Sequence, residues 1–321
     1  MSDVPLVSYL VPSYNHRAYV QQTVDSVLAQ DYPRIELIVG DDCSPDGSGE
    51  FLARYAAEKG FTLVQNETNL GSHRNLNRLI ELARGEYVGF LGSDDWIDPL
   101  KTKEQVAYLL ETQFDGVLAP VRKYEQATGV SQVLDLSHLQ QTFDEHRYLQ
   151  HLYTTDCDTA VGQSGLFRRR NVVDLGGFLP EYKSDDWLFQ MRFLQAGFRI
   201  GMLNKPFTNY RQHPSNTHRR AVYCLEEIQL PIINDFVPPE YRSRTLASVY
   251  ATAAHKLTEE NKMLSLRYAL KSFAYHPRPH YVVHYAKQLI LSFPQLRAAS
   301  MRWRNRSRYG NSRVGNAHHP R

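Results

Sequence analysis

Residues 85–99 read Gly-Glu-Tyr-Val-Gly-Phe-Leu-Gly-Ser-Asp-Asp-Trp-Ile-Asp-Pro, and this stretch decides the fold. Residues 87–91 form a short apolar run, which is typical of a strand buried on both faces. A Gly-Ser pair ends the run, and two adjacent carboxylates, Asp94 and Asp95, follow it. In an open α/β sheet, acids at the carboxyl end of a strand lie in the crevice where such sheets bind ligands.

Asp94 and Asp95 are expected to repel one another, so a site that holds both favours a cation or a shared proton. Carboxylate oxygens are hard ligands that suit Mg²⁺ or Mn²⁺, and these ions in turn suit a diphosphate. The alternative is an Asp-rich turn that caps the following helix.

The composition is ordinary for a globular protein, and 321 residues suffice for one large α/β domain and a smaller appendage. No apolar run approaches the roughly 18 residues that a transmembrane helix needs. The first five residues lead directly into strand-like sequence, so we expect no signal peptide. Cys43, Cys157 and Cys224 show neither a disulfide framework nor a zinc spacing, which favours a reducing cytoplasm.

The net charge of +3 hides an asymmetry along the chain. Residues 261–321 contain twelve Lys and Arg and no acid, so residues 1–260 carry a net charge of −9. An acidic body and a basic tail suggest two separate roles.

Strands and helices alternate through the first 120 residues. Apolar runs predict strands at 7–11, 35–39, 61–64, 87–91 and 116–120, and helical spacing predicts helices near 20–30, 51–56, 76–83 and 101–112. This alternation requires parallel strands with right-handed crossovers, so the predicted fold class is α/β with a doubly wound, mostly parallel sheet. Gly47-Ser48-Gly49 does not fit a dinucleotide-binding loop, because Leu52 stands where that fingerprint needs its third glycine.

Polar motifs follow the predicted strands in a characteristic order. They are Pro12-Ser13-Tyr14-Asn15, Asp41-Asp42 with Ser44-Pro45-Asp46-Gly47, Asn69-Leu70-Gly71 with Arg74-Asn75, Ala83-Arg84-Gly85-Glu86-Tyr87, and Ser93-Asp94-Asp95. Together they resemble the family 2 inverting glycosyltransferases, over roughly residues 5–215. The resemblance implies a sheet of GT-A type, as in the nucleotide-diphospho-sugar transferases, and a sugar moved from a nucleoside diphosphate sugar to an acceptor hydroxyl.

The resemblance also implies where the donor binds. Asp42 would accept a hydrogen bond from the imide N–H of the base, which suits uracil or thymine and hence a UDP- or dTDP-linked sugar. The other donor-binding residues carried over from the family pattern are Pro12, Ser13, Asn15, Arg74, Ser93, Asp94 and Arg211.

Metal and catalytic roles follow from the same resemblance. Mg²⁺ or Mn²⁺ would be held by Asp94, with Asp95 and with His213 of the Tyr210-Arg211-Gln212-His213 segment. Asp186 would be the general base, with Asp185 in place of the family's usual Glu. By itself the 185–186 pair is better explained as acids that complement the start of a helix. One departure is clear: the family commonly has Asp at the position of Gly92, so part of its Asp-X-Asp motif is missing here.

Residues 1–220 are predicted to form the catalytic domain, with a nucleotide-binding half to about 115 and an acceptor-side half from 116. Residues 221–296 are predicted to be a helical extension, with helices near 246–257, 263–275 and 281–291, and residues 297–321 a basic, disordered tail. Arginines interleaved with Trp303 and Tyr309 favour a peripheral contact with an anionic membrane on the cytoplasmic face of the inner membrane. The first alternative is a solvated tail without a partner. A contact with nucleic acid is the second alternative and the least favoured, so we expect no nucleic-acid partner.

A glycan or lipid-linked glycan is the expected acceptor, in bacterial surface polysaccharide synthesis. Two other functions remain open from the sequence: a noncatalytic sugar-nucleotide-binding protein with a degenerate Asp-X-Asp site, and a nucleotidyltransferase. Residues 12–19 lack the Gly-rich, Lys-containing loop that a nucleotidyltransferase favours.

Overall fold

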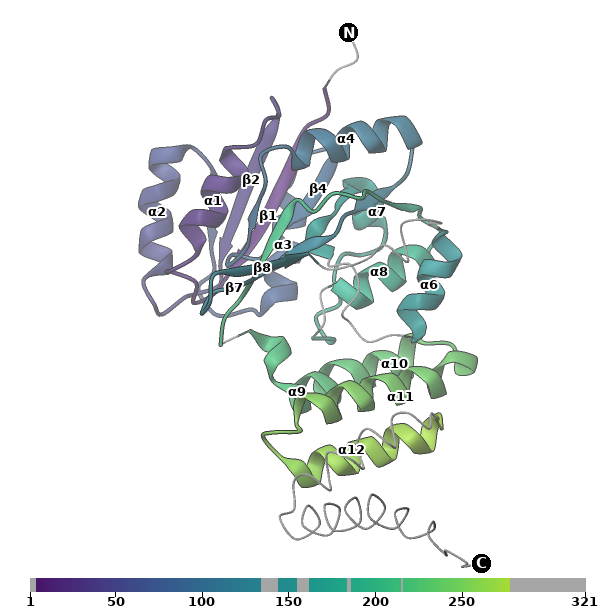
Figure 1. Ribbon diagram of the computed structural model, residues 1–321. Coiled ribbons are helices and arrows are strands. Elements are labelled where there is room, and N and C mark those ends of the chain that lie inside the picture. Colours follow the sequence, from purple (N-terminus) through teal and green to yellow (C-terminus); the bar gives the residue numbers. More distant parts are fainter. Residues whose placement is uncertain (1–3, 134–143, 155–161, 184–185, 215, 278–321) are drawn as a thin grey trace, which may run out of the picture. The chain divides into compact units, whose positions relative to one another are not determined.

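The computed structural model describes residues 4–133, 144–154, 162–183, 186–214 and 216–277 (Figure 1). The chain divides into two compact units, Met1–Arg242 and Ser243–Arg321. The domain boundaries expected after residues 115, 220 and 296 stay predictions.

The first unit is built on a seven-stranded sheet in the order β10-β6-β9-β4-β1-β2-β3. Four neighbouring strands on one side of it are parallel, as predicted: β1 (Val7–Ser13), β2 (Ile35–Asp41), the edge strand β3 (Thr62–Gln65) and β4 (Tyr87–Phe90). The strand β6 (Gly116–Leu118) pairs in parallel with the edge strand β10 (Ile200–Met202). Between β4 and β6 lies the short antiparallel strand β9 (Leu166–Arg168), which the sequence pattern did not predict. The sheet is therefore mostly parallel, and the predicted fold class is confirmed.

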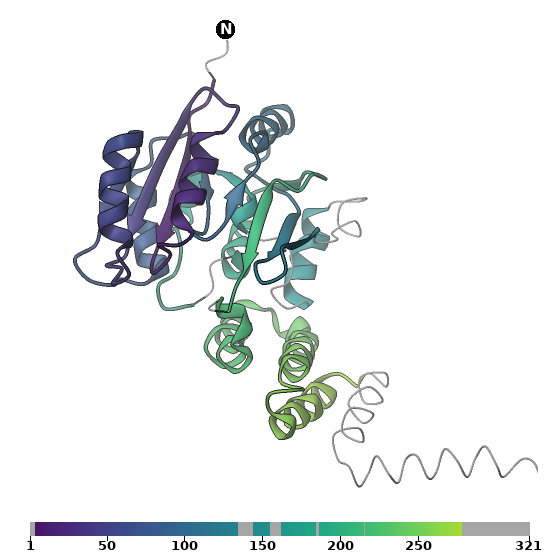
Figure 2. The same ribbon diagram turned by 60° about the vertical axis from the view of Figure 1, so that its left-hand side comes forward.

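Helices cover both faces of this sheet (Figures 1 and 2). Val24, Leu52 and Leu109 share one buried apolar cluster with alternate β1 residues, so their helices pack on the same face. On the other face Leu79 lies against Gly40 of β2, and Phe189 packs on Phe90 of β4. The helices of the first face are α1 (Val20–Leu28), α2 (Ser48–Lys59) and α4 (Lys101–Thr112), and those of the second are α3 (Ser72–Leu82) and α8 (Asp186–Gln195).

The chain enters a second sheet directly after Asp94 and Asp95. Its four strands run in the order β5-β11-β7-β8, namely β5 (Trp96–Ile97), β11 (Thr208–Gln212), β7 (Val121–Glu125) and β8 (Val130–Val133). Because β11 pairs with β5, the segment around Arg211 lies beside residues 94 and 95 although more than a hundred residues separate them. The sequence pattern did not predict this sheet.

The remaining described elements are helical. They are α6 (Glu145–Thr154), η1 (Gly162–Ser164), α7 (Arg169–Asp174), η2 (Thr217–Arg219), α9 (Ala221–Tyr223), the π-helix η3 (Cys224–Gln229), α10 (Leu230–Phe236), α11 (Pro239–Lys256) and α12 (Lys262–Tyr275). The helices predicted near 246–257 and 263–275 are present, whereas the one near 281–291 and the tail lie outside the described residues. In the described part of the chain, the helices are all too short or too polar to cross a bilayer.

One core position is unusual: the side chain of Lys101, at the start of α4, is fully buried. Its Nζ donates a hydrogen bond to Gln105 Oε1 at 2.7 Å and lies 5.3 Å from the centre of the Tyr9 ring. Burial disfavours the charged amine and lowers the pKa of Lys101 from 10.5 to about 7.

This buried amine predicts a pH-dependent stability. Between about pH 7 and the unfolded-state pKa, the unfolded chain binds more protons at Lys101 than the folded chain, so stability rises with pH. Below about pH 7 both states are protonated, and at roughly 1.4 kcal/mol per pKa unit the folded state bears a penalty of a few kcal/mol. We expect Lys101→Met to resist urea better than the wild type near pH 6, and this advantage to shrink towards about pH 9. Lys103→Met, at an exposed position of the same helix, is the control. An advantage of Lys101→Met that does not change with pH would contradict the prediction.

Candidate active site

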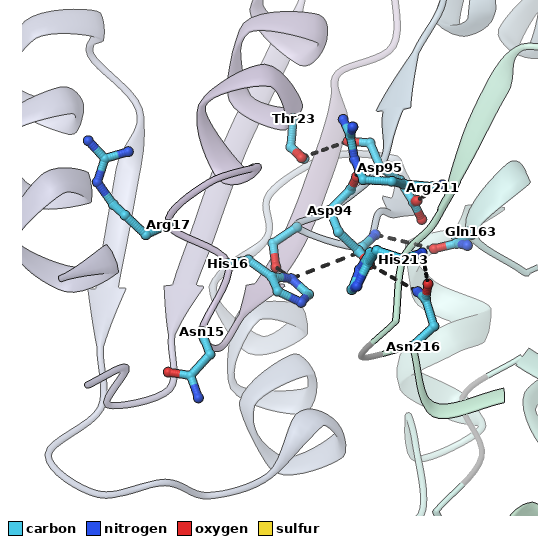
Figure 3. A network of polar contacts seen from close by, with 12 residues as sticks. Asn15, His16, Arg17, Thr23, Asp94, Asp95, Gln163, Arg211, His213 and Asn216 are labelled. Carbon is cyan, nitrogen blue, oxygen red and sulfur yellow. Dashed lines mark hydrogen bonds and ion pairs between the residues drawn. The ribbon is translucent and has the colours of Figure 1, made fainter. Parts of the chain in front are cut away.

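Asp94 is the centre of the polar network at the carboxyl edge of the main sheet (Figure 3). Its Oδ2 lies 3.0 Å from His213 Nε2 and 3.5 Å from Asn216 Nδ2, and its Oδ1 lies 3.9 Å from His16 Nδ1. Burial raises the pKa of Asp94, but the hydrogen bond with His213 and the neighbouring His16 outweigh it, so the pKa lies below its ordinary value. Asp94 is therefore an anion between two imidazoles.

These three residues form a candidate metal site. One ligand atom from each of His16, Asp94 and His213 lies within 4.8 Å of the other two. Burial is the main cause that lowers the pKa of His16, which favours the neutral imidazole that a metal needs. Asn216 Oδ1 accepts a hydrogen bond from the His213 backbone N–H at 2.5 Å, so Asn216 fixes the backbone that carries the His213 ring. Two imidazoles and a carboxylate are a donor set that fits a divalent cation.

Asp95 lies next to this cluster but forms its hydrogen bonds with Arg211 and Thr23. Its Oδ1 accepts a hydrogen bond from the Arg211 backbone N–H at 2.7 Å, and its backbone carbonyl accepts one from Thr23 Oγ1 at 2.6 Å. Burial raises the pKa of Asp95 well above its ordinary value, and the charge of Asp94 adds to this. Asp95 thus joins the loop of residues 92–95, here called the acid loop, to β11 and α1, and its role as a metal ligand stays a prediction.

Arg211 is enclosed rather than exposed. Its guanidinium lies 5.0, 4.7 and 5.8 Å from the ring centres of Tyr19, Trp96 and Tyr124. Its Nε donates to the Asp94 carbonyl at 2.7 Å, and a terminal nitrogen donates to Gln22 at 2.5 Å. This arrangement makes Arg211 a clamp on the acid loop, while its predicted contact with the donor stays a prediction.

Asp186 begins α8, and an aromatic cluster fixes that helix against the sheet. Phe189 lies 5.6 Å from the Phe90 ring and 4.9 Å from the Phe178 ring, measured between centroids. Asp186 itself is half-buried, and its charge contributes to the raised pKa of Asp95. The structure therefore brings Asp186 into electrostatic range of the acid loop, as the role of a base at this site requires. Asp185 lies outside the described residues.

The predicted nucleotide-binding residues gather at the ends of β1 and β2. Ser13 Oγ is buried and, within the described ranges, has no hydrogen-bond partner. Asp42 is also buried, and its carboxylate accepts hydrogen bonds from Asn66 Nδ2 and from the backbone N–H groups of Leu70 and Gly71, each at 2.8 Å. Asp42 thus already ties the turn at residues 69–71 to β2.

The other members of the set differ in exposure. Pro12 lies within β1, Asn15 and Arg74 are exposed, and Ser93 is buried with its Oγ 2.8 Å from His16 Nδ1. The structure brings Ser93 and Asp94 together with His16 and His213. The roles of all these residues towards a nucleotide stay predictions.

Gly92 stands where the related motif has an acid, and the structure shows why a side chain does not fit there. A Cβ at this position would lie 2.8 Å from Asp94 Oδ1, 3.0 Å from Asp95 Oδ2 and 3.2 Å from Gln163 Oε1. We expect Gly92→Ala to destabilise the protein by about 1–3 kcal/mol, the usual cost of overpacking, because the new Cβ presses on the buried carboxylates of Asp94 and Asp95. Urea unfolding measures the change, and a variant as stable as the wild type would show that the acid loop moves freely.

Sequence reasoning did not find His16, Asn216 or Gln163. His16 directly follows the Pro-Ser-Tyr-Asn segment at the end of the first strand, so its place at the rim was visible in the sequence. Nothing in the sequence links Gln163 to the acid loop, where its Oε1 accepts a hydrogen bond from the Gly92 N–H at 3.3 Å.

Known proteins resemble this chain in sequence. The family model described as glycosyl transferase family 2 matches residues 8–176, more than half of the chain. TuaG of Bacillus subtilis is 42% identical over 108 residues, which are 33% of this chain and 43% of TuaG. The poly(ribitol-phosphate) β-N-acetylglucosaminyltransferase TarS of Staphylococcus aureus is 28% identical over 254 residues, 75% of this chain and 43% of TarS. The chain thus spans less than half the length of both relatives.

Solved structures show the same fold. The crystal structure of TarS residues 1–349 with UDP-GlcNAc superposes with a TM-score of 0.54 at 20% identity, over 85% of this chain and 89% of that one. The mannosyltransferase PcManGT of Pyrobaculum calidifontis, solved with GDP-Man and Mn²⁺, gives a TM-score of 0.60 at 19% identity, over 94% of this chain and 84% of that one. The predicted GT-A arrangement is confirmed, and the chain belongs to glycosyl transferase family 2.

Proposed function

We propose that this protein transfers a sugar from a nucleoside diphosphate sugar to an acceptor hydroxyl, with inversion and with the help of a divalent cation. The observation that carries the proposal is Asp94, a buried anion between two imidazoles at the carboxyl edge of a parallel sheet. Ligands bind at this edge in open α/β sheets.

The departing diphosphate develops negative charge, and Asp94 with His213 would hold the cation beside it. A bound Mg²⁺ or Mn²⁺ would supply positive charge to that leaving group. The mannosyltransferase PcManGT was solved with Mn²⁺, which supports the same class of cation here. Asp95 and Arg211 keep the acid loop in place through their hydrogen bond.

The attacking hydroxyl must lose a proton, and Asp186 is the proposed acceptor. A half-buried carboxylate at the start of a rigid helix is well placed to hold one orientation while remaining accessible. A positioned base typically contributes about 10²–10⁴-fold to the rate. Direct attack by the acceptor on the anomeric carbon inverts the configuration and requires no covalent enzyme intermediate.

The donor is proposed to carry uracil or thymine. Ser13 offers a buried hydroxyl without a partner in the described ranges, at the strand end where the nucleoside would lie. TarS was solved with UDP-GlcNAc, which supports a uridine donor, whereas PcManGT was solved with GDP-Man. A glycan or lipid-linked glycan of the bacterial surface is the proposed acceptor. The names of two relatives support a polymeric product, since TuaG is named for teichuronic acid biosynthesis and TarS for poly(ribitol-phosphate).

A panel of UDP-, dTDP- and GDP-sugars tests the proposal by thermal unfolding with Mn²⁺ and with a chelator. We expect one sugar nucleotide to raise the melting temperature only in the presence of Mn²⁺. Stabilisation by a nucleoside triphosphate alone would favour a nucleotidyltransferase. A sugar nucleotide that binds without ever being cleaved would favour a noncatalytic binding protein.

Contact with an anionic membrane is a further part of the proposal. One face of α12 exposes two apolar side chains, Met263 (67% exposed) and Leu270 (61% exposed). Arg267 and Lys271 follow Met263 at helical spacing and lie on the same face. Apolar and basic side chains on one helix face suit an anionic lipid surface, and no acid follows Asn261 in the sequence. We place this contact at the cytoplasmic face of the inner membrane.

Flotation with phosphatidylglycerol-containing vesicles tests the membrane contact. A chain truncated after Pro294 and the double variant Arg267→Glu, Lys271→Glu should both bind less than the full chain. Binding that is undiminished in both, or equal on neutral vesicles, would contradict it.

A further inference from the structure

His16 lies in the loop between β1 and α1, outside the acid motif but beside it. We infer that His16 is a third protein ligand of the divalent cation, and that it takes the place of the acid missing at Gly92. The inference rests on the proposed function. Its consequence is a preference for first-row transition cations such as Mn²⁺ and Co²⁺ over Mg²⁺.

The geometry places His16 within reach of one ion shared with Asp94 and His213. The ligand atoms of the three residues lie within 4.8 Å of one another, and the two imidazole centroids are 5.8 Å apart at 89° (Figure 3). Ligand atoms about 2.0–2.3 Å from one ion lie at most roughly 4.5 Å apart. The largest separation in the cluster therefore lies close to that limit. Asp94 and His213 are already at the spacing of neighbouring ligands, 3.0 Å, and His16 Nδ1 has to approach Asp94 Oδ1 from 3.9 Å to share the ion.

The loop around His16 is fixed on both sides. Asn15 adopts the left-handed conformation (φ 58°), which Asn tolerates better than most residues, and its N–H donates to Ser44 Oγ at 3.0 Å. The Arg17 N–H donates to Asp46 Oδ2 at 2.9 Å. The imidazole between them is 25% exposed and lies 2.8 Å from Ser93 Oγ. His16 is therefore held towards Asp94 before any ligand binds.

The position that an acid would occupy is closed. A Cβ at residue 92 would meet carboxylate oxygens of Asp94 and Asp95 and the amide oxygen of Gln163 at 2.8–3.2 Å. An acid there would displace Asp94, so a further ligand has to come from another element. His16 is the member of the candidate cluster that lies outside the predicted metal set, and it supplies an imidazole nitrogen.

A nitrogen ligand changes which cation the site prefers. Mg²⁺ is bound mostly by oxygens and gives up water reluctantly, whereas affinity for nitrogen ligands rises from Mn²⁺ to Co²⁺ along the first row. Two imidazoles and one carboxylate should thus bind Co²⁺ and Mn²⁺ more tightly than Mg²⁺. When His16 is replaced by a residue without a nitrogen ligand, the preference for Co²⁺ and Mn²⁺ over Mg²⁺ should become smaller.

Calorimetric titration of Mn²⁺, Co²⁺ and Mg²⁺ into the full chain, with UDP present, tests this directly. We expect His16→Asn to weaken Mn²⁺ and Co²⁺ binding by at least about tenfold and Mg²⁺ binding far less. His16→Asp should recover binding and shift the preference towards Mg²⁺. Arg17→Lys is the matched control, because the Arg17 side chain lies over the Phe51 ring, 3.7 Å from its centre, and points away from Asp94.

Pulsed electron paramagnetic resonance of bound Mn²⁺ gives a second readout. The wild type should show coupling to the nitrogens of two imidazoles, and His16→Asn coupling to one. Unchanged Mn²⁺ affinity and unchanged nitrogen coupling in His16→Asn would overturn the inference and leave the proposed function intact. Weaker UDP binding in His16→Asn, equal with and without the cation, would also overturn it by making His16 a phosphate ligand. A wild type that binds neither UDP nor Mn²⁺ would remove the proposed function itself.

Discussion

Asp186→Asn is expected to lower the turnover number of sugar transfer by about 10²–10⁴-fold, the range that a positioned general base contributes. The amide has nearly the shape of the carboxylate but does not accept the proton of the attacking hydroxyl. Donor binding should change little, because none of the proposed donor contacts comes from α8. Steady-state kinetics and UDP titration on the same preparation separate the two effects.

Asp174→Asn is the matched control for this variant, since Asp174 is an exposed acid at the end of α7. It should retain wild-type turnover and wild-type donor affinity. If Asp186→Asn lost donor binding and thermal stability together with turnover, Asp186 would be a cap of α8 and not the base.

Asp94→Ala should abolish the part of UDP affinity that depends on Mn²⁺. Asp94 is the carboxylate that both imidazoles face. The loss of Mn²⁺ affinity should therefore exceed the roughly 10–100-fold loss that replacement of an outer-shell group causes at a metal site. The binding that remains should be the same with Mn²⁺ and with a chelator. Titration of UDP under both conditions gives the comparison.

The Asp94 prediction needs a check on folding, because His213 and Asn216 lose an acceptor in the variant. A buried donor left without its partner costs about 1–3 kcal/mol. Asp94→Asn keeps the shape and a carbonyl acceptor, so it should be more stable than Asp94→Ala and show the same loss of Mn²⁺ dependence. Wild-type Mn²⁺ dependence in Asp94→Asn would rule out the metal role.

The central sheet could be predicted from the sequence because its strands are buried on both faces. The runs at 7–11 and 87–91 are apolar at nearly every position, which predicts burial on both faces. The polar residues that follow each run show where the strand ends. The polar residues that follow these strands then had to lie at one edge of the sheet, Asp94 among them. That His213 lies 3.0 Å from Asp94 does not follow from the strand pattern, because His213 was carried over from the family resemblance.

The second sheet could not be read in the same way. β8 is exposed along its whole length and β5 has two residues, so neither of them carries an apolar period. These strands are specified by pairing with distant partners, as β5 is by β11. Local sequence contains no record of such pairing.

The site was predicted as a list of acids and bases, and the contacts between them came only with the fold. The enclosure of Arg211 by Tyr19, Trp96 and Tyr124 joins four elements, and no spacing in the chain indicates it. His16 was overlooked for a related reason, since a single histidine in a loop has no pattern. Its meaning depends on a distance of 3.9 Å to Asp94 across 78 residues.

Release of nucleoside diphosphate from sugar nucleotides tests the central claim most directly. The protein is incubated with UDP-, dTDP- and GDP-sugars, with Mn²⁺ or with a chelator, and free diphosphate is quantified over time. We predict slow release from a uracil- or thymine-containing donor with Mn²⁺, and none above background with the chelator or in Asp94→Ala. Release that is equal with the chelator, or the absence of release from every donor together with the absence of binding, would contradict a metal-dependent sugar transferase.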